Sequence, residues 1–153
     1  LEFRRVLFRS VGEASGGRPI RLPFNVSESR ETETGRFLTT FAGAGVHHIA
    51  LGTDDIVAAL DRAIARGAKF LPIPTNYYDD IAAKWGIDDQ RIEMLKQYNL
   101  LYDRDEHGEF LHAYTETFDR RFFFEFVQRI GGYRQYGAAN AAVRMAAQAR
   151  ARG

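Results

Sequence analysis

One aromatic stretch near the carboxyl end constrains the fold of this chain most strongly. It is FFFEF at residues 122–126. Alternate side chains of a strand point to opposite faces, so phenylalanines lie on both faces of this stretch. Glu125 therefore has apolar neighbours on whichever face it occupies. A buried carboxylate is costly unless it is paired with a cation or binds a metal. The sequence leaves two partners open, a nearby arginine (Arg121 or Arg129) or a metal ion.

Hydrophobic periodicity and turn residues predict a mixture of strands and helices. Strands are predicted at residues 18–24, 46–51, 70–73, 100–102, 109–115 and 121–128. Helices are predicted at residues 56–66, 77–85, 89–97 and 138–150, with a helical turn at residues 37–42. Asp54 or Asp55 can cap the helix that begins at Ile56, and Gly67 ends it. The pattern predicts one α+β domain, or part of one, in 153 residues.

The composition excludes several classes of function. The net charge is +1 and basic residues are scattered among acidic ones, so we expect neither a nucleic acid nor a membrane as a partner. No apolar run approaches the length of a membrane span. The absence of cysteine excludes disulfides, thiolate zinc sites and a cysteine nucleophile, which leaves His, Asp and Glu as strong metal ligands. These features fit a cytoplasmic protein.

Two of the four histidines are candidates for chemistry, and His48 is the first. It shares a face of its predicted strand with Val46 and Ala50, whereas His47 points the other way and is expected to be structural. His107 lies in a predicted hairpin turn and is expected to be exposed. A site of two imidazoles and one carboxylate suits Fe(II), and His48 could meet Glu125 across a curled sheet. A hydrogen-bonded core histidine is the alternative.

Five segments, in order along the chain, resemble the 4-hydroxyphenylpyruvate dioxygenase family. GAGVHHIAL at residues 43–51 resembles the family's GAGVQHIAL, whose histidine binds iron and falls on His48. FFEFVQR at residues 123–129 resembles its FLEVIQR strand, whose glutamate binds the metal and falls on Glu125. The other matches are LPFN at residues 22–25, FLPIPTNYY at residues 70–78 and YGAAN at residues 136–140.

The resemblance implies a vicinal-oxygen-chelate βαβββ module, half of an open curved sheet, with a helix at its carboxyl end. Such modules work in pairs, and the sequence shows no internal repeat. We therefore expect residues 43–153 to be the second module, residues 11–42 to be the end of the preceding module and a linker, and residues 1–10 to be a foreign leader. The missing amino-terminal module would supply a third metal ligand. Fe(II) is the expected ion, with Mg, Mn or Co as alternatives.

The sequence departs from the family in the expected substrate pocket. His112 replaces a glutamine that orients the substrate in the family, and Tyr114 replaces a phenylalanine. The pocket implied by the resemblance, which would take a small aromatic or 2-oxo acid ligand, consists of Asn25, His112, Tyr114, Gln128 and Asn140. His112 could act there as a hydrogen-bond donor that supports the metal site, or it could be a packing or surface residue.

Two longer segments, LYDRDEHGEFLHAYT and FFFEFVQRIGGY, resemble the carboxy-terminal domain of bacterial two-domain 3-dehydroshikimate dehydratases. In that family a TIM barrel related to sugar phosphate isomerases performs the dehydration, so an isolated fragment of this kind would be inactive. The first reading is therefore a metal-binding domain of such a fusion, within a parent that forms a homo-oligomer. The alternatives are a fragment of a genuine Fe(II)-dependent dioxygenase and a structural module in which Glu125 is salt-bridged without metal.

Overall fold

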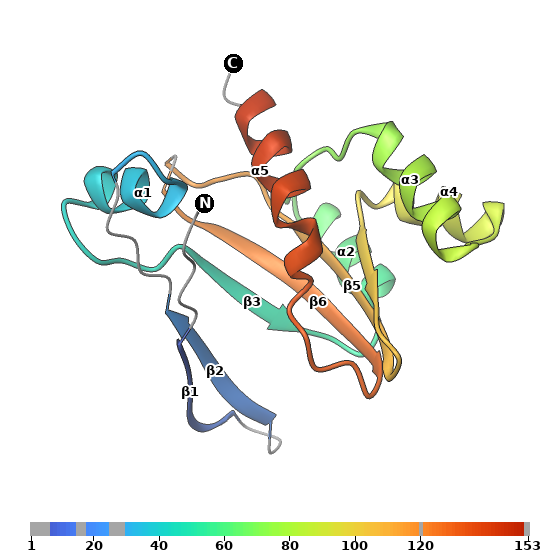
Figure 1. Cartoon of the computed structure of the whole chain (residues 1–153), viewed down its shortest axis with the longest axis horizontal. Helices are drawn as coiled ribbons and strands as arrows, with labels where there is room; N and C mark the ends of the chain where they lie inside the picture. Colours follow the sequence, from blue (N-terminus) through green and yellow to red (C-terminus); the bar gives the residue numbers. More distant parts are fainter. Residues whose placement is uncertain (1–6, 15–17, 25–29, 120, 152–153) are drawn as a thin grey trace. The chain divides into compact units, whose positions relative to one another are not determined.

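The structure is a computed structural model that describes residues 7–14, 18–24, 30–119 and 121–151. The chain divides into two compact units, Leu1–His47 and His48–Gly153, each with a sheet of its own (Figure 1). Within the described ranges, no helix is long and apolar enough to cross a membrane.

The first unit contains a hairpin and a helix. Strand β1 (Leu7–Ala14) pairs antiparallel with β2 (Arg18–Phe24), and helix α1 spans Glu33–Phe41. The strand predicted at residues 18–24 is confirmed, whereas β1 includes four residues, 7–10, that the sequence pattern does not assign to the fold. Helix α1 begins earlier than the predicted turn, because the Thr32 hydroxyl caps it by accepting a hydrogen bond from the Gly35 N–H at 3.0 Å.

A four-stranded mixed sheet, in the order β3-β6-β5-β4, forms the base of the second unit. Its strands are β3 (His48–Gly52), β4 (Leu101–Arg104), β5 (Gly108–Tyr114) and β6 (Phe123–Gly131). Strands β4, β5 and β6 pair antiparallel, whereas β3 joins β6 in parallel. The connection from β3 to the rest of the sheet contains α2 (Ile56–Ile64), α3 (Thr75–Trp85) and α4 (Asp89–Gln97).

Helices lie on both faces of this sheet. Figure 1 shows α2 behind the sheet and α5 (Ala141–Arg150) crossing in front of it. Helix α2 contributes the fully buried Ile56 and Leu60 to the core, and Asp55 caps it as predicted. On the front face, the guanidinium of Arg144 in α5 lies 5.6 Å from the centre of the Phe123 ring on β6. The predicted α+β order with a helix at the carboxyl end is confirmed.

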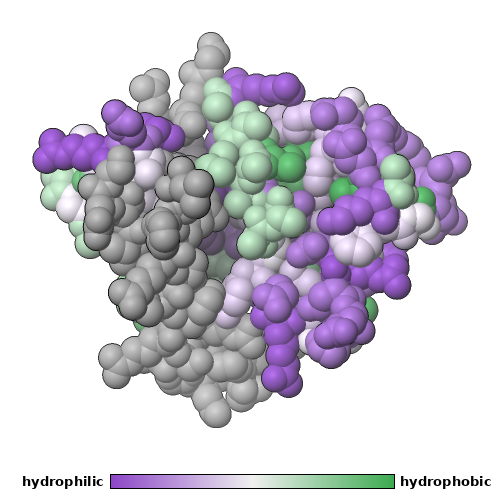
Figure 2. Space-filling view, viewed as in Figure 1, coloured by the Kyte–Doolittle hydropathy of each residue, from purple (hydrophilic) through white to green (hydrophobic). Residues whose placement is uncertain are grey.

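The main core includes residues from the sheet and from helices α2, α3, α4 and α5. Its most deeply buried apolar members are Ile56, Leu60, Tyr78, Leu95, Leu100, Leu101, Ala113 and Phe123. Burying one large apolar side chain contributes roughly 1.5 to 3 kcal/mol, so this cluster provides the principal stabilisation of the unit. Figure 2 shows hydrophilic residues over the outer side of α3 and α4 and weakly hydrophobic residues along the alanine-rich α5.

The prediction of a strand at residues 70–73 is wrong, because the structure forms no strand there. Only Phe70 makes an isolated bridge, to Thr115, and the Leu71 N–H donates to the Tyr114 carbonyl at 2.8 Å. Pro72 and Pro74 lack an N–H and cannot extend a ladder of hydrogen bonds. The segment therefore passes the edge of the sheet as an extended connection rather than as a full strand.

Glu109 of β5 ties the β4–β5 hairpin to helix α4. Its carboxylate accepts hydrogen bonds from the Tyr102 hydroxyl at 2.9 Å and from two nitrogens of the Arg91 guanidinium. Burial raises the pKa of Glu109, but the hydrogen bonds from Arg91 and Tyr102 and the positive charge of Arg91 lower it more. The pKa therefore lies below its ordinary value.

Glu109→Gln is expected to destabilise the fold near neutral pH by about 1 kcal/mol, because it removes an ion pair with two hydrogen bonds. A carboxyl with a lowered pKa stabilises the folded state above its unfolded pKa, and the stabilisation is lost as the pH falls through the folded pKa. Urea unfolding near neutral pH and at about pH 3 measures this difference. A wild-type advantage that persists undiminished at the acidic pH would contradict the assignment.

Candidate metal centre

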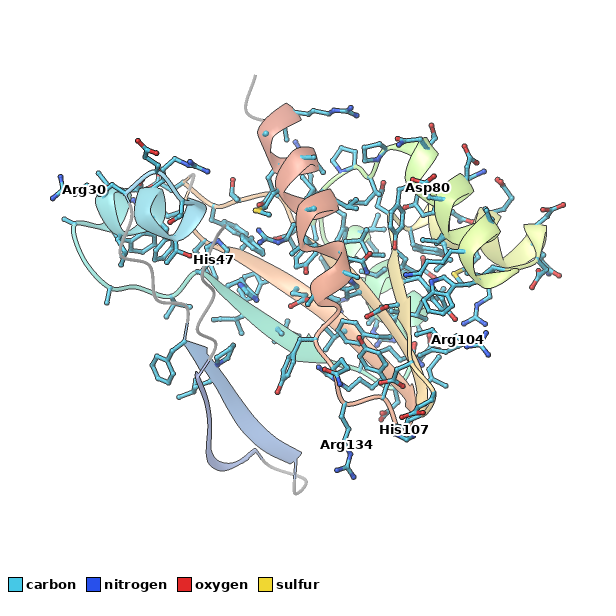
Figure 3. The ribbon with its side chains drawn as sticks, in the orientation of Figure 1. Arg30, His47, Asp80, Arg104, His107 and Arg134 are labelled. Atoms are coloured by element: carbon cyan, nitrogen blue, oxygen red, sulfur yellow. The ribbon has the colours of Figure 1, made fainter. Side chains whose placement is uncertain are left out.

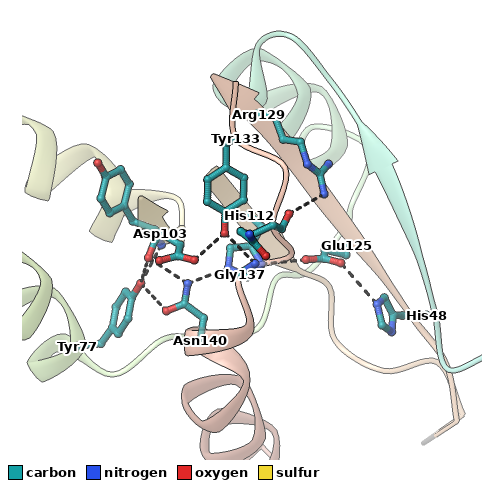
Figure 4. A network of polar contacts seen from close by, with 11 residues as sticks. His48, Tyr77, Asp103, His112, Glu125, Arg129, Tyr133, Gly137 and Asn140 are labelled. Atoms are coloured by element: carbon teal, nitrogen blue, oxygen red, sulfur yellow. Dashed lines mark hydrogen bonds and ion pairs between the residues drawn. The ribbon is translucent and has the colours of Figure 1, made fainter. Parts of the chain in front are cut away.

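The structure brings His48 and Glu125 together on one face of the sheet. His48 pairs with Phe123 across the parallel β3–β6 ladder, so Glu125, two residues further along β6, shares the face of His48. The His48 Nε2 atom lies 3.5 Å from the Glu125 Oε2 atom (Figure 4). The His48 ring also stacks on the Phe123 ring, with centroids 5.1 Å apart. Two residues 77 positions apart in the sequence thus meet because their strands are neighbours.

The second oxygen of Glu125 faces His112 on the other neighbouring strand, β5. The His112 Nδ1 atom lies 2.8 Å from Glu125 Oε1, and the His112 side chain is fully buried. Of the two arginines that could have paired with this carboxylate, Arg121 lies 3.8 Å from Asp119, and the Arg129 guanidinium lies 4.8 Å from the centre of the Phe110 ring. Histidines from two strands therefore flank the buried carboxylate.

The surroundings of Glu125 favour its charged form. Burial raises the pKa of this carboxyl, but hydrogen bonding with His112, the attraction of His112 and His48 and hydrogen bonding with Tyr114 lower it more. The pKa of Glu125 therefore lies below its ordinary value although the residue is only 7% exposed. Burial, followed by the negative charge of Glu125, raises the pKa of the Tyr114 hydroxyl well above its usual range. Glu125 is an anion and Tyr114 is a neutral donor near pH 7.

Asn140, at the end of the short 3-10 helix η1 (Ala138–Asn140), contacts the opposite side of His112. Its Nδ2 atom lies 3.0 Å from His112 Nε2 and donates to the Tyr102 carbonyl at 3.0 Å. The Tyr77 hydroxyl lies 3.1 Å from Asn140 Oδ1. Tyr77 is buried, and a buried tyrosine hydroxyl requires a polar partner, so that requirement could have indicated its role in this network.

A turn between β6 and η1 closes over His112. The Tyr133 hydroxyl donates to Asp103 Oδ2 at 2.6 Å and accepts a hydrogen bond from the Gly137 N–H at 3.0 Å. Gly137 has a φ of +59°, and a Cβ at this position would lie 2.9 Å from the Phe110 ring and 3.1 Å from the His112 ring. The turn therefore requires glycine for both its backbone conformation and its close approach.

The remaining predicted pocket residues are not all at this site. Gln128 lies on the opposite face of the sheet, where its side chain accepts from the Ile56 N–H at 3.1 Å and donates to the Asp54 carbonyl at 2.6 Å. It thus secures the beginning of α2, because residues 126 and 128 alternate away from Glu125 on β6. Asn25 lies outside the described residues.

The other two histidines are placed as the sequence predicts. His107 is exposed at the hairpin turn (Figure 3), with its side chain 65% accessible. In the first unit, the His47 ring packs edge-on against Phe37, with centroids 5.2 Å apart.

His48 and Glu125 fit two positions of a metal coordination sphere. Two donors bound at about 2.1 Å on adjacent octahedral positions lie about 3 Å apart, close to the observed 3.5 Å between Nε2 and Oε2. Among the described residues, no set of three or more His, Cys, Asp or Glu side chains is arranged to hold a metal. The His48 side chain is 26% exposed, so a further ligand has access on that side.

A family model described as Glyoxalase/Bleomycin resistance protein/Dioxygenase superfamily matches residues 5–89, more than half of the chain. The 3-dehydroshikimate dehydratase of Pseudomonas putida is 53% identical over 134 residues, which are 87% of this chain and 21% of the dehydratase. The 4-hydroxyphenylpyruvate dioxygenase of Caenorhabditis briggsae is 32% identical over 80% of this chain and 32% of the dioxygenase. The chain spans only about a fifth to a third of the length of these relatives.

A solved structure of a xylose isomerase-like TIM barrel/4-hydroxyphenylpyruvate dioxygenase fusion protein is similar to this chain, with a TM-score of 0.77 and 45% sequence identity. The match covers 97% of this chain and 26% of the fusion protein. The resemblance drawn from the sequence motifs and the α+β fold that it implied are both confirmed.

Gly137→Ala is expected to lower the free energy of unfolding by about 2 to 3 kcal/mol, because it adds a steric overlap to an unfavourable backbone conformation. Gly86→Ala is the matched control. Gly86 has a similar φ of +61°, but a Cβ there would meet no atom within 4 Å. Gly86→Ala is expected to lower the free energy of unfolding by about 1 kcal/mol, because only the backbone conformation becomes unfavourable. Chemical unfolding measures both, and equal losses would show that the turn does not press on Phe110 and His112.

Proposed function

Since the chain belongs to the Glyoxalase/Bleomycin resistance protein/Dioxygenase superfamily, we propose that it is a metal-binding module in which His48 and Glu125 are two of the ligands. The observation that carries the proposal is the 3.5 Å approach of His48 Nε2 to Oε2 of a buried, ionised carboxylate. A buried carboxylate with an imidazole beside it presents a carboxylate oxygen and an imidazole nitrogen to the same point. A divalent cation would neutralise that charge.

Fe(II) is the ion that we propose, with Mg, Mn or Co as alternatives that the same donors accept. Imidazole and carboxylate suit these ions, and a facial set of two histidines and one carboxylate leaves positions open for other ligands. When bound, such an ion would supply a Lewis acid that a 2-oxo acid can chelate and, for iron, a centre that can activate O₂. A third protein ligand would come from an amino-terminal module, because the described residues offer His48 and Glu125 alone at this point.

We propose that residues 43–153 are the carboxy-terminal module of a fusion of the 3-dehydroshikimate dehydratase kind. Two relatives named 3-dehydroshikimate dehydratase are 53% and 52% identical, and this chain covers 21% and 23% of them. The similar solved structure is likewise a fusion that contains a TIM barrel. In this proposal the barrel performs the dehydration and the module described here binds a metal beside it. The module by itself would have no dehydratase activity.

A genuine 4-hydroxyphenylpyruvate dioxygenase is the second candidate, favoured by the identity of 32% to that enzyme and by the His48–Glu125 pair. One contact argues against it. The residue that replaces the substrate-orienting glutamine of that family, His112, has both ring nitrogens within hydrogen-bond distance of protein groups, Glu125 and Asn140. It therefore has no nitrogen to offer a substrate. In the metal-free structural module, the third candidate, contacts with His112 and His48 would stabilise the charge of Glu125 in place of an arginine.

Glu125→Ala is expected to abolish metal binding, because it removes the only charged ligand that this module contributes. Metal content by elemental analysis and Co²⁺ affinity by calorimetry, both measured on the two-module polypeptide, check this. Glu116→Ala is the control, since Glu116 is an exposed residue in the loop between β5 and β6. Undiminished metal content in the Glu125 variant would contradict the proposal.

The complete polypeptide is expected to dehydrate 3-dehydroshikimate and to leave O₂ untouched when it is given 4-hydroxyphenylpyruvate and Fe(II). The reason is that a buried, doubly hydrogen-bonded His112 replaces the group that orients this substrate in the dioxygenases. An oxygen electrode and an ultraviolet assay for the dehydrated product measure the two reactions side by side. Rapid O₂ uptake that depends on 4-hydroxyphenylpyruvate would favour the second candidate.

A further inference from the structure

We propose that His112 is a positioning residue, fixed by Asn140 in one tautomer, that holds Glu125 Oε1 and so leaves Oε2 as the metal-binding oxygen. This inference rests on the proposed metal-binding function. It assigns His112 neither to the substrate nor to the metal. It also assigns Asn140 the role of fixing the His112 tautomer.

The orientation of the Asn140 amide follows from its neighbours. The Tyr102 carbonyl can only accept a hydrogen bond, so the atom of Asn140 that lies 3.0 Å from it must be the amide nitrogen. The Tyr77 hydroxyl, which accepts from the Tyr102 N–H at 2.8 Å, uses its own proton toward Asn140 Oδ1 or the Tyr102 carbonyl. A flipped amide would set two carbonyl oxygens against each other at Tyr102. The amide nitrogen therefore faces His112.

The tautomer of His112 follows from the Asn140 orientation. The second proton of the amide nitrogen points to His112 Nε2 at 3.0 Å, so Nε2 is the acceptor. The other nitrogen, Nδ1, lies 2.8 Å from Glu125 Oε1, and it carries the hydrogen because a carboxylate oxygen can only accept. The ring is fully buried, and Phe110 and Tyr114 pack against it with centroids 4.7 and 5.2 Å away.

The two oxygens of this carboxylate, which also has a hydrogen bond with Tyr114, face different histidines. Oε1 receives the His112 N–H, whereas Oε2 faces His48, whose ring nitrogen lies 3.5 Å from it. An ion between His48 and Glu125 therefore meets Oε2 in a fixed direction, as a single-oxygen ligand. Both ring nitrogens of His112 have protein hydrogen-bond partners, so this histidine would act on an ion only through Glu125. Partners of this type commonly change metal affinity by about 10- to 100-fold.

The first test measures Co²⁺ affinity by calorimetry in the two-module polypeptide with three variants. His112→Leu removes the donor and is expected to weaken binding by about 10- to 100-fold. His112→Asn places an amide nitrogen where Nδ1 stands and is expected to restore affinity to within about tenfold of wild type. Asn140→Leu removes the amide that fixes the His112 tautomer, and it is expected to weaken Co²⁺ binding less than His112→Leu does.

Thermal unfolding of the metal-free variants separates positioning from a purely structural role. Both His112 substitutions disturb the packing, so a structural role predicts that affinity falls in both of them in step with stability. Rescue of affinity by asparagine without rescue of the unfolding temperature supports positioning. Unchanged affinity in His112→Leu, with binding lost in Glu125→Ala, overturns this inference alone. Unchanged affinity in Glu125→Ala instead overturns the proposed function.

The second test needs neither variants nor metal. Nitrogen-15 NMR of the histidine rings in the full chain reports which nitrogen of each ring carries the hydrogen. His112 is expected to carry its hydrogen at Nδ1 and to accept a hydrogen bond at Nε2. A His112 ring protonated at Nε2 would overturn the proposal whatever the variants do.

Discussion

One buried carboxylate, held from both sides by imidazoles, organises the front face of the second unit. Glu125 lies on β6, between β3 and β5, and each of its oxygens faces a histidine of one of these strands. Without these partners, burial would raise the pKa of Glu125 and destabilise the fold. The sheet order β3-β6-β5 is therefore an electrostatic requirement as well as a packing arrangement, because it alone places His48 and His112 next to this strand.

A second layer of contacts connects the carboxylate to the last part of the chain. Asn140 joins the His112 ring to the backbone of β4 and to the hydroxyl of Tyr77 in α3. The turn before it is fixed by Tyr133, whose hydroxyl reaches Asp103 on β4. Helix α5 can therefore pack on the front face only when the polar groups beneath it have found these partners. Packing of the carboxyl end and orientation of the carboxylate are parts of one network.

The two sides of Glu125 differ in their access to solvent. His112 is fully buried, whereas the His48 side chain is 26% exposed on β3, which is an edge strand of its sheet. Polar atoms on the His112 side are satisfied within the module. On the His48 side, the partial exposure of the imidazole leaves it accessible from solvent. This asymmetry agrees with relatives that are three to five times longer than the portion they share with this chain.

The sequence by itself determined most helices and strands, because periodicity and caps act locally, and it identified Glu125 as a charge in need of a partner. It also predicted that His48 could meet Glu125 across a curled sheet, and it left open whether an arginine or a metal ion balances the charge of Glu125. It did not determine the role of His112 or the placement of Gln128, and it overestimated the strand at residues 70–73. Alternation along one strand states which face a side chain takes. Which hydrogen-bond partner a side chain meets on that face depends on the register between strands that are distant in sequence. The tertiary structure sets that register.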